Sequence, residues 1–402
     1  MFFYVLIPPW ISFLIVLGII LALSKKELGL VLSFGAFIFA LLTEVELLSS
    51  IIAVITDYSI IILAIAVALI PILGGIMEES GLMVELVQKL DISKKASLMV
   101  SPAFFGLLPV PGGALMSAPI VDQIDPELNP NQVVAVNVWY RHALIMIYPL
   151  APTLIVASFL SGISLYVIVF AMIIPFIVMV IIGYATLLRS INPKQEKHQR
   201  DIKRVLHNSI PIIIAPIIDF LGRTFFNLSV PEVFLLIGLI LSIFIALRFA
   251  KMPVKQLGET AKKMKIWRFP IIIFAMFWFL EVFIRSGVPE EIGDLQLPFI
   301  VFLAIGFFLG FATGRVQLPL SIMIPIYLIQ NSVFIMPIID FVFLYSATFI
   351  GYLVTPIHPC VSYSVNFFDT DYKNAMKFLA KPALICLGLT FSAYMIFFLM
   401  VS

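Results

Sequence analysis

The sequence predicts an all-α polytopic membrane protein with about ten membrane-crossing helices, and two observations support this fold class. First, 62% of the 402 residues are hydrophobic and only 12% are charged, whereas a soluble domain carries about 25% charged residues. Second, several apolar runs reach or exceed the roughly 20 residues that a helix needs to span a bilayer. We therefore expect a multi-pass protein in the lipid bilayer of the cell (inner) membrane.

The apolar segments predict a series of uninterrupted helices in two halves of the chain. These helices lie at about 4–23, 28–43, 57–77, 163–188, 208–225, 231–250, 269–285 and 374–401. The most polar stretch, RSINPKQEKHQRDIKR, begins at Arg189 and separates the halves. We expect a first repeat at 1–188, a basic cytoplasmic linker at 189–206 and a second repeat at 207–402.

A cluster of helix-breaking residues interrupts the apolar region 97–121. The cluster, GLLPVPGGA from position 106, contains Pro109, Pro111, Gly112 and Gly113. Proline removes a backbone donor and glycine lowers helix propensity. In hydrocarbon, a broken backbone is tolerated only where protein or water satisfies its polar groups. The cluster therefore predicts the tip of a re-entrant hairpin at about 96–122, with a plain loop between two short spans as the alternative.

The second half predicts a matching hairpin, and each half predicts a broken helix. The second hairpin lies at about 298–330 with ATGR, positions 312–315, at its tip. The broken helices lie at about 132–160 and 334–367; their breaks contain Pro149 with Pro152, and Pro356 with Pro359, at the same spacing and about 207 residues apart. A re-entrant hairpin does not cross the membrane, so each half crosses an odd number of times. The halves are therefore predicted to be inverted repeats.

The distribution of basic residues predicts the orientation. One side of the predicted helices receives Lys25, Lys26, Lys89, Lys94, Lys95, the linker, the run 248–268, Lys373 and Lys377. The other side receives Arg223 and Arg285, with Glu44, Glu46, Glu290, Glu291 and Asp294. By the positive-inside rule the basic side is cytoplasmic. Both termini are then outside, the first hairpin enters from the cytoplasm and the second enters from outside. Lys25 and Lys26 follow the first apolar segment, which is the wrong order for a cleaved signal peptide.

Interrupted backbone entering from both sides predicts a binding site near the middle of the membrane. Helix N-termini carry positive partial charge, which suits an anion, and unwound carbonyls suit a sodium ion. The predicted substrate-binding residues are Pro109, Pro111, Gly112, Gly113, Thr313, Gly314, Arg315, Arg141, His142, Pro149, Pro152, Pro356, His358 and Pro359.

Arg315 is the preferred charge partner, because an arginine inside the membrane is costly unless it has a function. Its guanidinium can make a forked contact to a carboxylate or phosphate; a structural brace is the alternative. Arg141, next to His142, could line the same cavity or extend toward the cytoplasmic end of its helix. His358 lies inside the second break, where it could contact substrate or take a proton.

Two acidic residues are candidates for proton coupling. Asp219 and Glu281 each precede an arginine by four residues, at Arg223 and Arg285. This spacing places both members of a pair on one helix face, so structural ion pairs are the favoured interpretation. Cys360 and Cys386 form no CxxC motif, so the sequence identifies no metal site, and Cys360 is interpreted as a packing residue.

Three motifs carry a likeness to known proteins: LPVPGGALMSAP at 108–119, YRH at 140–142 and YPLAP at 148–152. With these motifs the chain resembles the ion-transporter superfamily of citrate, gluconate, C4-dicarboxylate, dicarboxylate/sodium and arsenite permeases, and within it the domain-of-unknown-function family 401. The resemblance implies a homodimer in which a transport domain of hairpins and broken helices moves past a scaffold as an elevator. The sodium-coupled dicarboxylate branch carries Ser-Asn-Thr at its hairpin tips, where this chain has Pro-Gly-Gly and Ala-Thr-Gly-Arg.

Together these features predict a secondary active transporter that moves a small organic anion, with a carboxylate as the expected class, coupled to Na⁺ or H⁺. A cation/proton exchanger on the same fold is the alternative. An intramembrane enzyme is disfavoured because the sequence has no HExxH, paired intramembrane aspartates or GxSxG. No GxxxxGK[ST] motif occurs, so we expect no cofactor apart from Na⁺ as a coupling ion. We expect no nucleic-acid partner.

Overall fold

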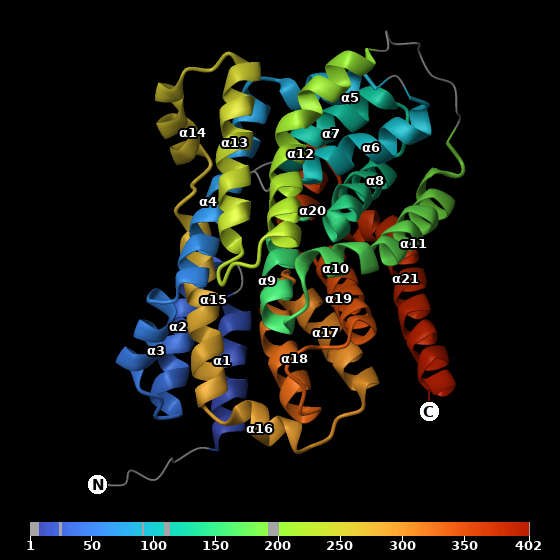
Figure 1. Ribbon diagram of the computed structural model, residues 1–402. Helices are drawn as coiled ribbons and strands as arrows, with labels where there is room; N and C mark the ends of the chain where they lie inside the picture. The colour runs from blue at the N-terminus through green and yellow to red at the C-terminus, as the bar shows by residue number, and fades with distance from the viewer. Residues whose placement is uncertain (1–7, 24–25, 91, 108–112, 192–200, 402) are drawn as a thin grey trace.

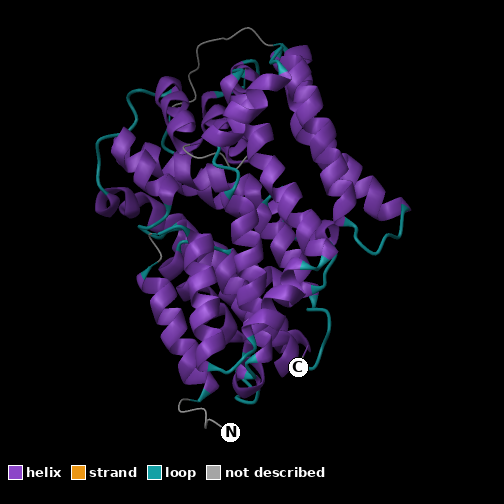
Figure 2. Ribbon diagram, turned by 90° about the vertical axis from the view of Figure 1, so that its left-hand side faces the viewer, coloured by secondary structure: helices purple, strands orange, loops and turns teal. Residues whose placement is uncertain are grey.

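The computed structural model describes residues 8–23, 26–90, 92–107, 113–191 and 201–401. Every regular element within these ranges is helical, as Figure 2 shows. The predicted all-α class is therefore confirmed. Five helices are long and apolar enough to cross a membrane, or up to seven if each bent pair counts as one span.

The first half of the chain contains both long and short helices. They are α1 (Pro9–Ala22), α2 (Leu28–Leu42), α3 (Leu47–Ile55), α4 (Tyr58–Glu79), α5 (Leu82–Gln88), α6 (Lys94–Leu107), α7 (Gly113–Ile124), α8 (Pro130–Ala143), η1 (Leu144–Ile147), α9 (Pro152–Ser161), α10 (Leu165–Ala171), α11 (Ile173–Gly183) and η2 (Tyr184–Leu188).

The second half has a similar order of elements. They are α12 (Ile202–Phe225), α13 (Glu232–Ala250), η3 (Val254–Gln256), α14 (Leu257–Lys263), α15 (Arg268–Arg285), α16 (Val288–Gly293), α17 (Phe299–Thr313), α18 (Gln317–Gln330), α19 (Ile338–Leu353), α20 (Pro359–Phe367) and α21 (Tyr372–Val401).

Local sequence sets several of these helix boundaries. Asp57 caps α4, its side chain accepting a hydrogen bond from the Ile60 amide at 3.1 Å, which satisfies one of the free donors of a helix N-terminus. Pro152 and Pro359 begin α9 and α20 at the first helical position, where proline costs nothing because the missing N–H would be unpaired anyway.

Some helices are shorter than a full span. The helices α1, α2, α17, α18 and α19 are apolar but only 10–17 residues long. The pair of α8–η1 and α9 is bent by 42° across the Pro149–Pro152 break. The predicted ten crossings therefore exceed the five to seven spans that length and composition support in the described residues, because about 20 residues are needed to cross hydrocarbon at a moderate tilt.

One set of helices, which we call group 1, consists of α1–α4 and α12–α15 (Figure 1). Within it α2 and α4 from the first half pack on α15 and α13 from the second. Side-chain bonds join the halves: the Ser59 hydroxyl donates to Glu232 at 2.9 Å, and the Trp278 indole N–H donates to Ser50 at 3.0 Å. Group 1 is therefore assembled from both halves of the chain.

A second set, group 2, consists of α6–α9 and α17–α21. Here α7 and α8 pack on α20, and α9 packs on α18. The Asn137 side-chain amide donates to Ser364 at 2.9 Å, and the Tyr345 hydroxyl donates to Thr153 at 3.0 Å. Each of these bonds connects one half of the chain to the other, so both broken helices share one packed unit.

In each half of the chain, a short helix that follows a glycine connects group 1 to group 2. The short helices α5 and α16 begin after Gly81 and Gly287, whose φ angles are +75° and +74°. Glycine adopts this left-handed conformation without the Cβ penalty of other residues. In Figure 1, α5, α6 and α7 lie near the upper end of the molecule, whereas α16, α17 and α18 lie toward the lower end.

Candidate functional site

A cavity of about 420 Å³ lies between group 1 and group 2. Group 1 contributes residues of α2, α4 and α15, and Met264 after α14; group 2 contributes residues of α6, α8, α9, α18, α19 and α20. Sites for small ligands have volumes of roughly 300–1,000 Å³ and few polar groups, so the size suits a small molecule. Its charged lining residues are Glu27, Arg141, Arg268 and Arg315.

Arg315 projects from the short connection between α17 and α18. Gly314 ends α17 in the left-handed conformation, with φ +62°, and the Arg315 amide lies 3.3 Å from the Thr313 hydroxyl oxygen, to which it donates. Within the described ranges the Arg315 guanidinium makes no hydrogen bond or ion pair with another side chain. The connection therefore presents a cation to the cavity.

Arg141 lies near the end of α8 and lines the same cavity. The residue is 5% exposed, and its Nη1 lies 3.5 Å from the Ser117 hydroxyl of α7. A Cβ on Gly106 would lie 1.8 Å from the Arg141 carbonyl oxygen, so glycine is what allows α6 to approach α8 here. The sequence left open whether Arg141 faces the cavity of Arg315, and the structure places both on it.

Two histidines face each other beside these arginines. The ring centroids of His142 and His358 are 4.5 Å apart, and each ring also contacts Tyr352, at 5.5 Å and 4.3 Å. Both histidines are buried, with 1% of each residue exposed, and both line the cavity. The two broken helices therefore contribute two imidazole groups to the wall that also carries the guanidinium groups of Arg141 and Arg315.

Three helix N-termini meet the cavity as well. The lining includes Ala151–Thr153 at the start of α9, Val316–Gln317 at the start of α18 and His358–Cys360 at the start of α20. Free N–H groups and the helix dipole give each N-terminus a positive partial charge. Together with two guanidinium groups, they make group 2 an electropositive wall.

Group 1 supplies the one carboxylate among the described residues that line the cavity. The Glu27 Oε2 atom lies 3.1 Å from Arg268 Nε, and both residues line the cavity. Because the charge of Glu27 is paired with Arg268, the charged side chains of the cavity carry a net positive charge. Such a cavity suits an anion better than a free cation.

Other predicted site residues have different positions. Pro109, Pro111 and Gly112 lie outside the described residues; Gly113 begins α7. Pro152, Gly314 and Pro359 line the cavity, whereas Thr313, Pro149 and Pro356 are not among its lining residues.

The two candidate coupling acids lie away from this cavity. Asp219 is fully buried and accepts from Arg223 Nε and from the Tyr166 hydroxyl, both at 2.9 Å. Glu281 accepts from Arg285 Nε at 2.7 Å in a partly exposed pair. Both pairs have the geometry that the spacing predicted. Their role in proton coupling stays a prediction.

Several lining residues were not predicted from the sequence. They are Thr153, Gln317, Tyr352, Glu27, Arg268 and Cys360. Tyr352 and Gln317 carry no local signal, since only the packing of α18 and α19 brings them to the cavity. Cys360 was interpreted as a packing residue, although its place next to the Pro-x-x-Pro break could have marked it.

The family model for DUF401, described as a protein of unknown function, matches residues 10–397. The chain belongs to this family. That part of the resemblance is confirmed, and membership of the wider ion-transporter superfamily stays a prediction. No curated protein matches the chain.

Among solved structures, the fold is similar to that of the YdaH transporter of Alcanivorax borkumensis, whose topology is described as unusual. The TM-score is 0.54 at 15% sequence identity, and the match covers 82% of this chain and 83% of that one. At this identity the likeness establishes a shared fold for the DUF401 chain.

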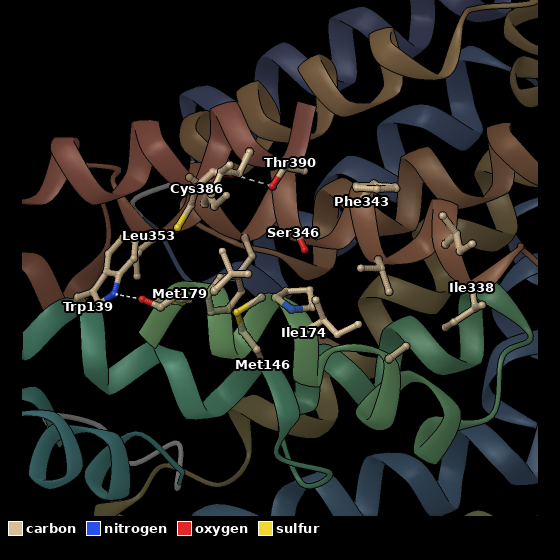
Figure 3. Close-up of a pocket in the computed structure, with 18 residues that line it drawn as sticks. Trp139, Met146, Ile174, Met179, Ile338, Phe343, Ser346, Leu353, Cys386 and Thr390 are labelled. Carbon is tan, nitrogen blue, oxygen red and sulfur yellow. Dashed lines mark hydrogen bonds between the residues drawn. The ribbon is translucent and has the colours of Figure 1, made fainter. Parts of the chain in front are cut away.

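A second cavity in this DUF401 protein differs sharply in chemistry. It has a volume of about 350 Å³ and is lined by α8, η1, α10, α11, α19 and α21 (Figure 3). Its residues are almost all apolar, and none is charged. The Trp139 indole N–H donates to the Met179 carbonyl at 3.0 Å and the Thr390 hydroxyl donates to the Cys386 carbonyl at 2.9 Å. The 350 Å³ cavity therefore offers mainly apolar contacts to a ligand. For this reason the 420 Å³ cavity is the candidate functional site.

Proposed function

We propose that this protein is a secondary active transporter for a small organic anion, with a carboxylate as the substrate class. The observation that carries the proposal is that Arg141 and Arg315, from different halves of the chain, line one cavity. The anion would accept hydrogen bonds from Arg315 and from the N-termini of α9, α18 and α20. A hydrogen bond to a charged group is worth about 1.5–3 kcal/mol, and the guanidinium fork adds geometric specificity for a carboxylate.

The position of the cavity between two helix groups supports an elevator mechanism. Group 2 carries the electropositive wall and both broken helices, whereas group 1 supplies the opposite wall. We infer that group 2 moves as one body along group 1, and that this movement exposes the anion to each side of the membrane in turn. The internal bonds of group 2, such as Tyr345 to Thr153, favour its movement as a unit.

The proposal also includes inverted repeats and an orientation of the chain in the membrane. Related elements, such as α6–α7 and α17–α18, lie toward opposite ends of the molecule in Figure 1, as inverted repeats require. The basic segments, including the α14 region, belong to the upper end of that view, which we assign to the cytoplasm. Both termini are then outside. A homodimer in the inner membrane completes this proposal.

Coupling to Na⁺ or H⁺ would supply the energy. A cation/proton exchanger that uses Asp219 or Glu281 is the second candidate, and the burial of Asp219 beside Tyr166 is the observation that favours it. The electropositive cavity favours the anion transporter over this exchanger. We expect no enzymatic activity in either case.

The test is a thermal-shift measurement on purified protein against small carboxylates, phosphates and sulfonates, each with sodium or choline at two pH values. A ligand that binds the folded state raises its free energy of unfolding by about 2.7 kcal/mol at 100 times the Kd, and the apparent Tm rises with it. We expect at least one anion to stabilise the wild type and to lose this effect in Arg315→Ala.

The matched control is Arg285→Ala, because Arg285 is paired with Glu281 outside the cavity. This variant should respond to the anion as the wild type does, relative to its own Tm. A sodium requirement for the shift would identify the coupling ion. If no anion shifts the Tm but pH or monovalent cations do, the exchanger replaces the anion transporter.

A further inference from the structure

We propose that His142, His358 and Cys360 form a binding site for a transition-metal ion of the Zn²⁺ class on the wall of the 420 Å³ cavity. Potential ligand atoms of these three side chains all lie within 4.8 Å of one another. All three residues line the cavity. Two imidazoles and a thiol are ligands that Zn²⁺ and related borderline metals prefer.

The hydrogen bond of His142 orients its ring as a ligand. Its Nδ1 lies 2.6 Å from the Val138 carbonyl oxygen, one turn earlier in α8. A carbonyl oxygen only accepts, so Nδ1 carries the proton and Nε2 of the neutral ring keeps its lone pair. Metal-binding histidines commonly have this arrangement, with the second ring nitrogen donating to a carbonyl or carboxylate.

His358 offers a ring nitrogen from the residue that precedes α20. Its Nδ1 is buried and has no hydrogen-bond partner among the described residues. A buried polar atom without a partner costs about 1–3 kcal/mol. A metal ion bound at Nδ1 would remove this cost. The unpartnered Nδ1 of His358 is therefore the observation that points to a ligand.

Cys360 supplies the third group. It is partly exposed, in the first turn of α20, and forms no disulfide. The other cysteine, Cys386, lies buried in α21 at the apolar cavity, so it does not compete for the metal or for Cys360. One Cys and two His leave the fourth tetrahedral position open, as in zinc sites that also bind a substrate or water.

The present spacing requires a small closure. Bonds of 2.0–2.3 Å to Zn²⁺ place tetrahedral ligand atoms about 3.3–3.8 Å apart, so the three atoms must approach by roughly 1 Å. Rotation of the Cys360 and His358 side chains can supply this movement, since both belong to the same short turn before and within α20.

The arginines make metal binding dependent on an anion, and this consequence rests on the proposed function. Arg141 and Arg315 line the same cavity and repel a free cation. An anion in the cavity offsets that repulsion and can occupy the open coordination position. We therefore expect the metal and the anion to strengthen each other's binding by the same factor, as linkage requires.

The test is a titration of purified protein with ZnCl₂ by calorimetry, together with CoCl₂ titration followed by absorption in the thiolate-to-cobalt charge-transfer region. We expect one metal per chain in the wild type. Cys360→Ser should abolish the charge-transfer band, and both Cys360→Ser and His358→Gln should weaken Zn²⁺ binding on the order of 100-fold, at least as much as loss of an outer-shell partner.

The controls are Cys386→Ser and His207→Gln, which remove the other cysteine and a histidine stacked on Phe249 outside the cavity. Both should bind metal as the wild type does. Metal binding that is absent from the wild type, or that survives unchanged in both Cys360→Ser and His358→Gln, would overturn the site. A circular-dichroism melt of each variant separates loss of ligand from loss of fold.

A second arm adds succinate as the anion probe. Succinate should tighten Zn²⁺ binding in the wild type, and this gain should disappear in Arg315→Ala. If Zn²⁺ binds through Cys360 but succinate and the other anions of the panel neither change the Zn²⁺ affinity nor shift the Tm, the metal site stands and the proposed anion transport fails. The two proposals can therefore fail separately.

Discussion

His142 and His358 lie with their ring centroids 4.5 Å apart, although one belongs to the first half of the chain and the other to the second. His142 is near the end of α8 and His358 is the residue before α20. Their contact brings the two broken helices together at the wall that also carries Arg141 and Arg315. The candidate site is therefore a product of both halves, and neither half contains it alone.

The fork of the Arg315 guanidinium should matter as well as its charge. Arg315→Lys keeps the charge but loses bidentate geometry, so we expect the anion Kd to rise roughly 10-fold, against roughly 100-fold for Arg315→Ala. Isothermal titration with the anion found by thermal shift measures both. Equal affinity in wild type and Arg315→Ala would make Arg315 a structural brace.

A larger side chain at Gly106 should reduce both the stability of the protein and its affinity for the anion. In Gly106→Ala the new Cβ would lie 1.8 Å from the Arg141 carbonyl oxygen, so α6 and α8 must separate. We expect a loss of about 1–3 kcal/mol in stability, typical of overpacking, and weaker anion binding because Arg141 moves. The control Gly388→Ala adds its Cβ where nothing lies within 4 Å, and its Tm should not fall. An unchanged Tm in Gly106→Ala would contradict this packing.

The two acidic pairs should differ in their effect on stability. Asp219 is fully buried and its partner Arg223 is largely buried, with 17% of its side chain exposed. Removal of one partner of a buried ion pair costs about 3–5 kcal/mol. The Glu281–Arg285 pair is partly exposed, and such pairs are worth about 0–1 kcal/mol. Thermal melts should therefore show a large decrease in Tm for Asp219→Asn and a small decrease for Glu281→Gln. A stable Asp219→Asn variant whose transport no longer depends on pH would identify Asp219 as a coupling acid instead.

A cross-link between the helix groups should stop transport without stopping binding. Phe159 of α9 and Phe277 of α15 have ring centroids 4.7 Å apart and join group 2 to group 1. A short bis-maleimide, which adds one cysteine thiol across each of its two double bonds, should join the cysteines of Phe159→Cys/Phe277→Cys, abolish uptake into liposomes and leave the anion-induced Tm shift. The two variants with one introduced cysteine each, treated identically, control for reaction at the native Cys360 and Cys386. Continued uptake by the fully cross-linked protein would rule out sliding of these groups.

Several helices follow from local sequence. Hydrophobic runs predicted helices at 57–77, 231–250 and 269–285, and the structure has α4 at Tyr58–Glu79, α13 at Glu232–Ala250 and α15 at Arg268–Arg285. In contrast, α3, α5, α14 and α16 were not predicted. Helices of so few residues are marginal by themselves, so their formation depends on packing against neighbours such as α15 on α3.

The sequence by itself determined the all-helical class, the apolar spans and the positions of both Pro-x-x-Pro breaks, because hydrophobicity and proline act through local backbone physics. It also marked Arg141, Arg315 and His358 as unusual residues for an apolar segment. Only the tertiary structure decided that these residues line one cavity with His142, Tyr352 and Cys360. The contact of α8 with α19 and α20 joins residues more than 200 positions apart. Such contacts depend on how whole helices pack, which no local pattern in the chain specifies.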